Sequence, residues 1–385
     1  MTPCKATILL VLAVNFLTTG QSQVHFEKTI SLPRSNQFAN RMVQAKDGNF
    51  IIVGVTDAFG SDDIFVLKVD PKGDTLWTTH YGAVNAKDYA TDIISTSSGY
   101  VITGSSMGYS LKGKTDAFVM KIDETGEWLE YPITIGSEAD DIAKDIIETK
   151  DGNFVLIIEK WIGYSYSEVF IYKIDKKGNR IWTASPNNSN PSTGGGIVED
   201  ENGDIIFTGT VTNQLEKDKD AIVMKLNGKD GQIKWTTTLN DTDNFHESAQ
   251  AIAKSKGGNF LIAIGKRSPE GRILLYVSVD KSGNYKFGED SFTLDNSEFS
   301  TSTPNHIFET KDGNVLISGQ VKGDGFVVKL QPNGQKIFSQ TFTGHLVQGL
   351  ELNNGDLVFI GDKIDETKFR DVFFLKTDSG GRTNN

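Results

Sequence analysis

The sequence predicts an all-β protein, a single seven-bladed β-propeller of four-stranded antiparallel blades that is closed by its N-terminal strand. The main observation is a turn motif, KDGN at residues 46–49, whose glycine returns about every 50 residues along the chain. Each copy also contains four short extended segments, and none of them has a sustained helical period. The turn glycines are Gly48, Gly99, Gly152, Gly203, Gly258, Gly313 and Gly355.

The second copy illustrates the four strands of a blade. They are predicted at residues 91–96, 100–104, 116–123 and 128–135, with glycine-containing turns between the first two and the last two. Four short strands per unit joined by tight turns are typical of a propeller blade. Strand three, DAFVMKID in this copy, is apolar at four or five consecutive positions, which predicts burial on both faces between neighbouring blades.

An aromatic residue follows the turn between strands three and four. In most copies it stands four residues after the turn glycine, and we interpret these rings as packing residues. Trp128 stands only two residues after Gly126, which keeps it on the same face because a strand has a period of two. The other members are Trp77, Trp182, Trp235, Phe287 and Phe338.

The two ends of the chain predict export and ring closure. Residues 1–22 have the features of a secretory signal peptide, with Lys5 ahead of an apolar run at 6–17 that is too short to span a membrane. Residues 23–385 are then one propeller domain, in a secreted or periplasmic protein. The seventh copy ends without a fourth strand, and we expect residues 24–31 to supply it and so to hide two open sheet edges.

Several segments resemble the SBBP-type β-propeller repeats of secreted bacterial proteins. They are WTTHYG at 77–82, KDYATDI at 87–93, SGYVITGSS at 98–106, TDAFVMKID at 115–123 and TGEW at 125–128. The third copy departs from the pattern because it lacks the glycine that ends strand two elsewhere. The resemblance implies a propeller outside the cytoplasm, and it implies no particular reaction and no catalytic residues.

Composition and motifs exclude several classes of function. The formal charge of −11 disfavours nucleic-acid binding, whose affinity comes from basic residues that neutralise phosphates. The single cysteine, Cys4, lies ahead of the apolar run, where it cannot carry a lipid anchor, and is lost with the signal segment. No HExxH motif is present in the sequence, and we expect no metal, no cofactor and no catalytic set.

Acidic residues recur at equivalent positions of the repeats. A reaction needs one site, whereas a repeated contact is needed in every blade, so we expect these carboxylates to bond loop amides or neighbouring blades. They open strand three or precede strand one, and are Asp63, Asp116, Asp220, Asp324, Asp371, Asp88, Asp141 and Glu247.

A second set of candidates lies seven residues before each turn glycine. Strand one of each blade should line the central channel, so these side chains should form a polar ring near one mouth. The ring is either a hydrated plug of paired charges or a site that captures a ligand, and Arg41 and His306 are its candidate ligand-binding residues. The positions are Arg41, Asp92, Asp145, Gly196, Ala251, His306 and Gln348.

Aromatic side chains also gather between strands two and three of blade three. Trp161, Tyr164 and Tyr166 have no place in the repeat pattern, and loops on a rigid scaffold are where binding residues concentrate. Tyr109 and Arg267 are predicted on other loops of the same face. We therefore expect any ligand to contact the face formed by the connections between strands two and three and between blades.

Two classes of function follow. The first is a non-catalytic binding scaffold, monomeric, for a glycan or an extracellular protein. The alternative is a carbohydrate-active enzyme such as a polysaccharide lyase, whose base and cation would be His306 with Arg41, or His246 with Arg267 or Arg272. A quinone-dependent dehydrogenase is a third hypothesis that depends only on the repeated strand and tryptophan pattern.

Overall fold

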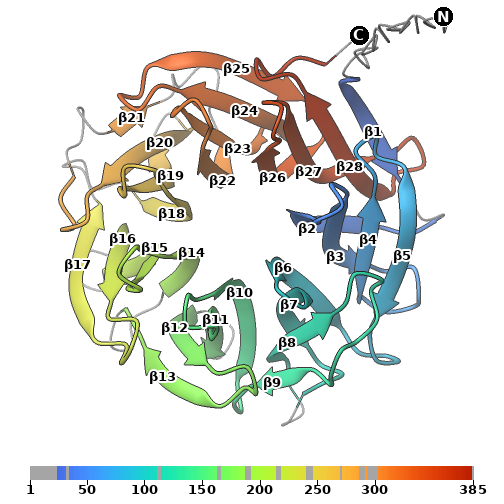
Figure 1. The fold of residues 1–385 in the computed structure, drawn as a ribbon, viewed down its shortest axis with the longest axis horizontal. Coiled ribbons are helices and arrows are strands. Elements are labelled where there is room, and N and C mark those ends of the chain that lie inside the picture. Colours follow the sequence, from blue (N-terminus) through green and yellow to red (C-terminus); the bar gives the residue numbers. More distant parts are fainter. Residues whose placement is uncertain are drawn as a thin grey trace, which may run out of the picture.

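Seven four-stranded antiparallel sheets surround a central axis in the computed structural model (Figure 1). The structure describes residues 24–31, 34–110, 114–162, 166–186, 192–213, 218–239, 246–268, 271–285, 291–293 and 302–383. The predicted signal peptide and Phe287 lie outside these ranges. Every regular element within them is a strand, so the predicted all-β propeller is confirmed.

The strands of each blade run in sequence order from the axis to the rim. Blade one contains β2 (Gln37–Gln44), β3 (Phe50–Thr56), β4 (Asp63–Val69) and β5 (Thr75–Tyr81). Blade two contains β6 (Asp88–Thr96), β7 (Gly99–Ser106), β8 (Asp116–Ile122) and β9 (Ile133–Ile135). Blade three contains β10 (Asp140–Glu148), β11 (Phe154–Ile162), β12 (Tyr166–Ile174) and β13 (Arg180–Ala184). Blade four contains β14 (Ser192–Glu199), β15 (Ile205–Asn213), β16 (Asp218–Leu226) and β17 (Ile233–Leu239).

The remaining blades follow the same order. Blade five contains β18 (Glu247–Lys254), β19 (Phe260–Ser268), β20 (Gly271–Val279) and β21 (Ser291–Thr293). Blade six contains β22 (Thr303–Glu309), β23 (Val315–Val321), β24 (Asp324–Leu330) and β25 (Lys336–Phe342). Blade seven contains β26 (His345–Glu351), β27 (Leu357–Ile364), β28 (Arg370–Thr377) and, as its outermost strand, β1 (Phe26–Ile30).

The N-terminal strand closes the ring as the sequence predicts. β1 pairs antiparallel with β28 from Phe26 opposite Lys376 to Ile30 opposite Val372. The rings of Phe26 and Phe374 lie 6.0 Å apart, and Phe374 in turn lies 5.5 Å from Phe50 of blade one. The first and last blades therefore share one apolar core, and β1 lies beside β28 at the rim of the disc (Figure 1).

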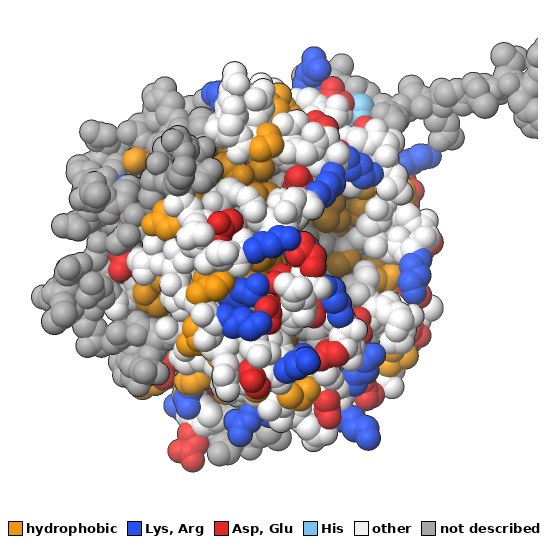
Figure 2. All heavy atoms as spheres, turned by 60° about the vertical axis from the view of Figure 1, so that its left-hand side comes forward, with side chains coloured by type: hydrophobic (Ala, Val, Ile, Leu, Met, Phe, Trp, Pro, Cys, Tyr) orange, Lys and Arg blue, Asp and Glu red, His pale blue; other side chains and the backbone are white. Residues whose placement is uncertain are grey.

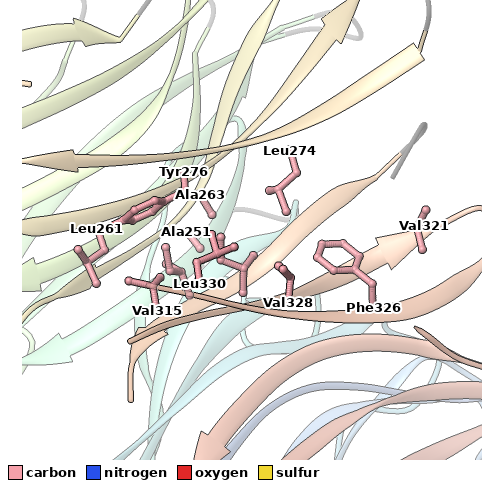
Figure 3. Packing of buried hydrophobic residues seen from close by; sticks show 12 residues of the cluster. Ala251, Leu261, Ala263, Leu274, Tyr276, Val315, Val321, Phe326, Val328 and Leu330 are labelled. Atoms are coloured by element: carbon pink, nitrogen blue, oxygen red, sulfur yellow. The ribbon is translucent and has the colours of Figure 1, made fainter. Parts of the chain in front are cut away.

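Buried apolar side chains fall into seven clusters among the described residues, one between each pair of neighbouring blades. Figure 3 shows the cluster in which Leu261 and Tyr276 of blade five face Val328 and Leu330 of blade six. The middle strands supply alternate residues to the clusters on their two sides, and β3 and β4 are buried at every position. This confirms the burial on both faces that the apolar run of strand three predicts.

A ring and a glycine pack together between the outer strands of successive blades. Gly231, at the turn before β17, has a φ of 74°, and a methyl group added to it would lie 2.8 Å from the Trp182 ring of the preceding blade. Only glycine combines this backbone angle with this close approach. The same packing joins Trp77 to Gly126, Trp235 to Gly283, Phe338 to Gly381 and Phe26 to Gly73.

Blade two breaks this pattern, and the prediction that Trp128 is a packing residue is wrong. Ile133 contacts Gly178 of the next blade in its place, whereas Trp128 is 41% exposed. The predicted strand at 128–135 is correspondingly reduced to β9, which has three residues, and an isolated bridge between Ile122 and Trp128. A shift of two residues leaves a side chain on the same face only within a continuous strand. In blade two the strand is interrupted between Trp128 and β9.

The surface carries both signs of charge. Figure 2 shows Lys and Arg side chains beside Asp and Glu side chains over the visible face. In the described ranges, no helix has the length and apolar composition needed to cross a membrane.

Removal of the closing strand tests its contribution to stability. Deletion of residues 24–31 should expose the β28 edge and cause aggregation or a large fall in melting temperature. Phe26→Ala should lower the free energy of unfolding by about 2 kcal/mol, because the half-buried ring packs on Phe374 and Gly73. Val24→Ala, at a side chain that is 54% exposed, is the control and should have no effect. Thermal melts that are unchanged by the deletion would contradict closure by β1.

Candidate functional site

The innermost strand of every blade carries a β-bulge at the same position. The sequence did not predict these bulges. The register against strand two shifts by one residue in every blade, as between Ala39 and Arg41 in blade one. The bulged residues are Asn40, Thr91, Lys144, Gly195, Gln250, Asn305 and Val347. All seven line a cavity of about 280 Å³ on the axis, together with Arg41 and Gly194.

Three of the bulged side chains also join their blade to the next one. The Asn40 side-chain amide donates to the Ala90 carbonyl at 2.6 Å, and the Thr91 hydroxyl donates to the Ala143 carbonyl at 2.9 Å. The Asn305 side-chain amide makes the corresponding bond with the Leu346 carbonyl at 2.7 Å. A bulge frees one residue per strand from the ladder, and here that residue is used in the contact between blades.

The predicted ring residues come directly after the bulges, and most of them bond the adjacent blade. Asp92 accepts from the Ile146 amide at 3.1 Å and Asp145 from the Ile197 amide at 2.8 Å. Gln348 accepts from the Met42 amide at 2.5 Å, and the Gly349 amide donates to His306 Nδ1 at 3.5 Å. Arg41 is the ring residue that lines the axial cavity, whereas His306 does not.

The charged members of the ring influence one another. Burial and the nearby Asp145 carboxylate raise the pKa of Asp92 well above its usual range, while Arg41, 3.5 Å from Asp92, opposes this shift. Burial and the Arg41 charge lower the pKa of His306 to about 3, so its imidazole is neutral and accepts the amide of Gly349. A neutral histidine in this bond makes His306 a structural link between blades six and seven.

The His306 pKa predicts an acid-dependent loss of stability. Below about pH 6.5 the unfolded chain takes up a proton at this histidine that the folded protein does not, so protonation favours unfolding. His306→Gln keeps a side-chain acceptor and should reduce the loss between pH 7 and pH 5 by about 2 kcal/mol. Urea titrations at both pH values measure this. The exposed His80→Gln is the control, and an equal loss in wild type and His306→Gln would contradict the assignment.

A second cavity, of about 250 Å³, lies on blades four to six. The starts of β18, β20 and β22 and the end of β19 meet there, so it opens on the predicted loop face. Its lining contains four cationic side chains, one carboxylate and one histidine. They are Lys219, Lys266, Arg267, Arg272, Glu247 and His246, with Thr303 and Ser302 from blade six beside them.

The inner wall of this cavity is a buried ion pair. Lys266 and Glu247 are opposite each other in the β18–β19 ladder, are 3% and 2% exposed, and have their Nζ and Oε1 atoms 3.6 Å apart. Glu247 therefore compensates the Lys266 charge. The exposed guanidinium groups of Arg267 and Arg272 remain as the excess of positive charge at the rim.

Two further bonds fix the rim. Arg272 Nη1 donates to the Thr303 hydroxyl at 2.8 Å, which joins blade five to blade six. The Lys219 amide donates to His246 Nδ1 at 3.1 Å, and the His246 carbonyl accepts from the Arg267 amide at 2.9 Å. Nδ1 of His246 is therefore the acceptor nitrogen in this contact.

The predicted site residues do not form one site. Arg267 lies in the rim of the blade-five cavity with His246 and Arg272, whereas Trp161, Tyr109, Arg41 and His306 do not line it. Lys219, Lys266 and Thr303 were not predicted. The available signal was the sequence KRSPEGR at 266–272, a basic hairpin in an acidic chain.

The prediction of an aromatic loop in blade three is wrong for Trp161. This residue lies within β11, opposite Asp140 and Ser167, and is 36% exposed. Tyr166 begins β12, so the two strands extend almost to the end of the hairpin. Tyr164 lies outside the described residues.

The recurrent acids act as predicted at Asp88 and Asp141. Asp88 accepts from the Ala83 amide at 2.8 Å and the Gly108 amide at 3.3 Å, and Asp141 accepts from the Ser137 amide at 2.7 Å. Both carboxylates therefore hold the connections between blades. Within the described part of the chain, no three His, Cys, Asp or Glu side chains converge as a metal site would require.

Comparison with known proteins identifies the fold. No protein-family model matches the sequence, and no curated protein is significantly similar to it. Solved structures of similar fold include a polysaccharide lyase, an ulvan lyase bound to -[GlcA(1-4)Rha3S]-, with 11% identity, a TM-score of 0.61 and coverage of 92% of this chain and 97% of that one.

Two further propellers are similar over most of their length. A streptogramin B lyase has 12% identity and a TM-score of 0.52, over 92% of this chain and 98% of that one. A protein of unknown function from Dyadobacter fermentans DSM 18053 has 11% identity and a TM-score of 0.52, over 91% and 97%. At these identities the likeness establishes the seven-bladed propeller and carries no activity to this chain.

Proposed function

We propose that the protein is a secreted, monomeric binding module of the SBBP propeller type, which captures an acidic glycan through the blade-five cavity. The observation that carries the proposal is the gathering of Lys219, Lys266, Arg267 and Arg272 around one cavity in a chain with a formal charge of −11. The preceding signal-like segment supports a site of action outside the cytoplasm.

The charge distribution favours an anionic ligand. A concave site lined by one sign of charge concentrates field lines and attracts ligands of the opposite sign, even when the protein as a whole repels them. Arg267 and Arg272 are opposite each other in the β19–β20 ladder and line the cavity, and a guanidinium binds carboxylates and sulfates through two parallel hydrogen bonds. The volume of about 250 Å³ suits a single acidic sugar unit or its charged group.

Neutral polar groups at the same site suit a sugar. Thr193, Thr210 and Ser248 line the cavity beside the cations, and Thr210 and Ser248 share a hydroxyl–hydroxyl bond of 2.9 Å. Such groups can exchange hydrogen bonds with ring hydroxyls while the arginines hold the acid. Trp161, Tyr166 and Tyr164, in blade three, remain candidate contacts for a longer chain.

Neutralisation of the two arginines tests the proposal. Arg267→Gln with Arg272→Gln should weaken binding of oligogalacturonate by at least tenfold, or about 1.4 kcal/mol, because each cation contributes a charge-assisted hydrogen bond. Isothermal titration at two salt concentrations measures the affinity and its screening. Arg382→Gln is the matched control, since Arg382 is exposed on the final turn and pairs only locally with Asp378. Equal affinity of the double variant and wild type, or no acidic oligosaccharide bound on a glycan array, would overturn the proposal.

A lyase is the second candidate, because the cavity brings His246 together with Arg267 and Arg272. A lyase needs a base that removes a proton next to the uronate and a cation that neutralises the acid. The Lys219 amide donates to Nδ1 of His246, so this nitrogen is not available to take a proton from a substrate, which favours binding over catalysis. Ultraviolet absorbance of an unsaturated product from polygalacturonate, abolished by His246→Ala, would establish the enzyme instead.

A further inference from the structure

The outer edge of blade two is built differently from the corresponding edge of the other blades. Ile133 contacts Gly178 where a tryptophan or phenylalanine contacts the glycine in most described blades, and Trp128 is free to lie at the surface. The turn of this blade also differs. In most blades a lysine of strand three pairs with a carboxylate of the turn between strands one and two, as Lys68, Lys173, Lys225, Lys329 and Lys376 do. In blade two the corresponding Lys121 pairs instead with Glu130 of the outer segment.

Four aromatic rings gather at this edge, and we call them the blade-two platform: Tyr81, Tyr109, Trp128 and Tyr131. Trp128 stacks on Tyr81 with centroids 5.7 Å apart and an interplanar angle of 28°. Tyr109 and Tyr131 meet Trp128 edge-on at 6.1 Å and 6.4 Å. Trp128 is 41% exposed and Tyr131 is 72% exposed, so both side chains are accessible to a ligand.

Hydrogen bonds and an ion pair hold the platform in place. The Leu129 amide donates to the Lys121 carbonyl at 3.0 Å, and Lys121 Nζ donates to the Lys176 carbonyl at 2.7 Å while pairing with Glu130. The Tyr81 hydroxyl bonds the Gly126 carbonyl, and the Thr134 hydroxyl bonds the Tyr109 carbonyl at 3.0 Å. Rings that are already fixed lose little conformational entropy when a ligand binds.

The surroundings select the chemistry of the ligand. Glu127 and Glu130 are exposed next to Trp128 and Tyr131 in the chain, and Glu127 acts on the Tyr81 hydroxyl, so the platform would repel a carboxylate or sulfate. Their oxygens can accept hydrogen bonds from sugar hydroxyls instead. A stable protein interface buries about 800 Å² on each partner, far more than four partly covered rings offer, whereas a sugar ring needs only one or two aromatic faces.

We propose that the blade-two platform is a binding site for an uncharged sugar ring, which stacks on Trp128 and Tyr131. The platform belongs to blades one and two and the cationic cavity to blades four to six. This site is therefore independent of the proposed acidic-glycan site and takes a ligand of different charge.

Neutral hexasaccharides of glucan, xylan, mannan and galactan type are the probes. Wild-type protein should bind at least one of them, detected by tryptophan fluorescence and calorimetry, with little dependence on salt. Trp128→Ala and Tyr131→Ala should each weaken that binding by at least tenfold. Tyr131 is 72% exposed, so its substitution should leave the melting temperature unchanged and keep the test independent of folding.

Two controls separate this site from others. Phe59→Ala removes a ring of blade one that is 52% exposed and outside the platform, and it should bind the neutral sugar as wild type does. Arg267→Gln with Arg272→Gln should also retain neutral-sugar binding, so failure of the acidic site does not affect this result. No binding of any neutral probe, or undiminished binding by Tyr131→Ala, would overturn the proposal. Self-association of wild type that Tyr131→Ala abolishes would also overturn it, in favour of a second copy.

Discussion

The structure depends on one constraint, that every blade has two apolar faces and each must be covered by a neighbour. Ile51 and Val53 of β3 pack toward blade two, while Phe50 and Ile52 of the same strand pack toward blade seven. A linear array of such units would leave an apolar face at each end. Closure of the ring removes both, and the outer aromatic–glycine contacts and the inner bulge contacts reinforce the same interfaces at the rim and at the axis.

The blades differ from one another at positions that the packing between neighbouring blades does not fix. Close to the axis, Asp92, Asp145 and Gln348 are committed to amides of the next blade, which leaves their bulged neighbours to line the cavity. On the loop face, Arg267 and Arg272 lie opposite each other on the β19–β20 hairpin of blade five, and Arg272 also bonds Thr303 of blade six. At the rim of blade two, an isoleucine packs where most of the other described blades have an aromatic ring, and Trp128 lies at the surface. The scaffold therefore carries a cavity lined by cationic side chains on blades four to six and an aromatic surface on blades one and two.

The sequence predicted the number of blades and the order of their strands because turn glycines and apolar runs recur in every copy. It predicted closure because the seventh copy lacks a last strand. It did not predict the bulges, which come from the curvature of the inner strands and leave no composition signal. Trp161 was placed in a loop because it breaks the repeat, yet β11 simply extends further in that blade. The cationic cavity joins side chains of separate blades, such as Lys219 and Arg272, so spacing along the chain could not assemble it.

Closure by an N-terminal strand has a consequence for how quickly and in what order the chain folds. Six blades consist of hairpins between neighbouring strands, contacts that form early because little loop entropy opposes them. Blade seven is different, since Ile30 meets Val372 across almost the whole chain. β1 is made first and has no partner until β28 exists, so the last step should be its docking, and that step should set the folding rate. β1 thus remains available to chaperones, or to another chain, for longer than any other strand.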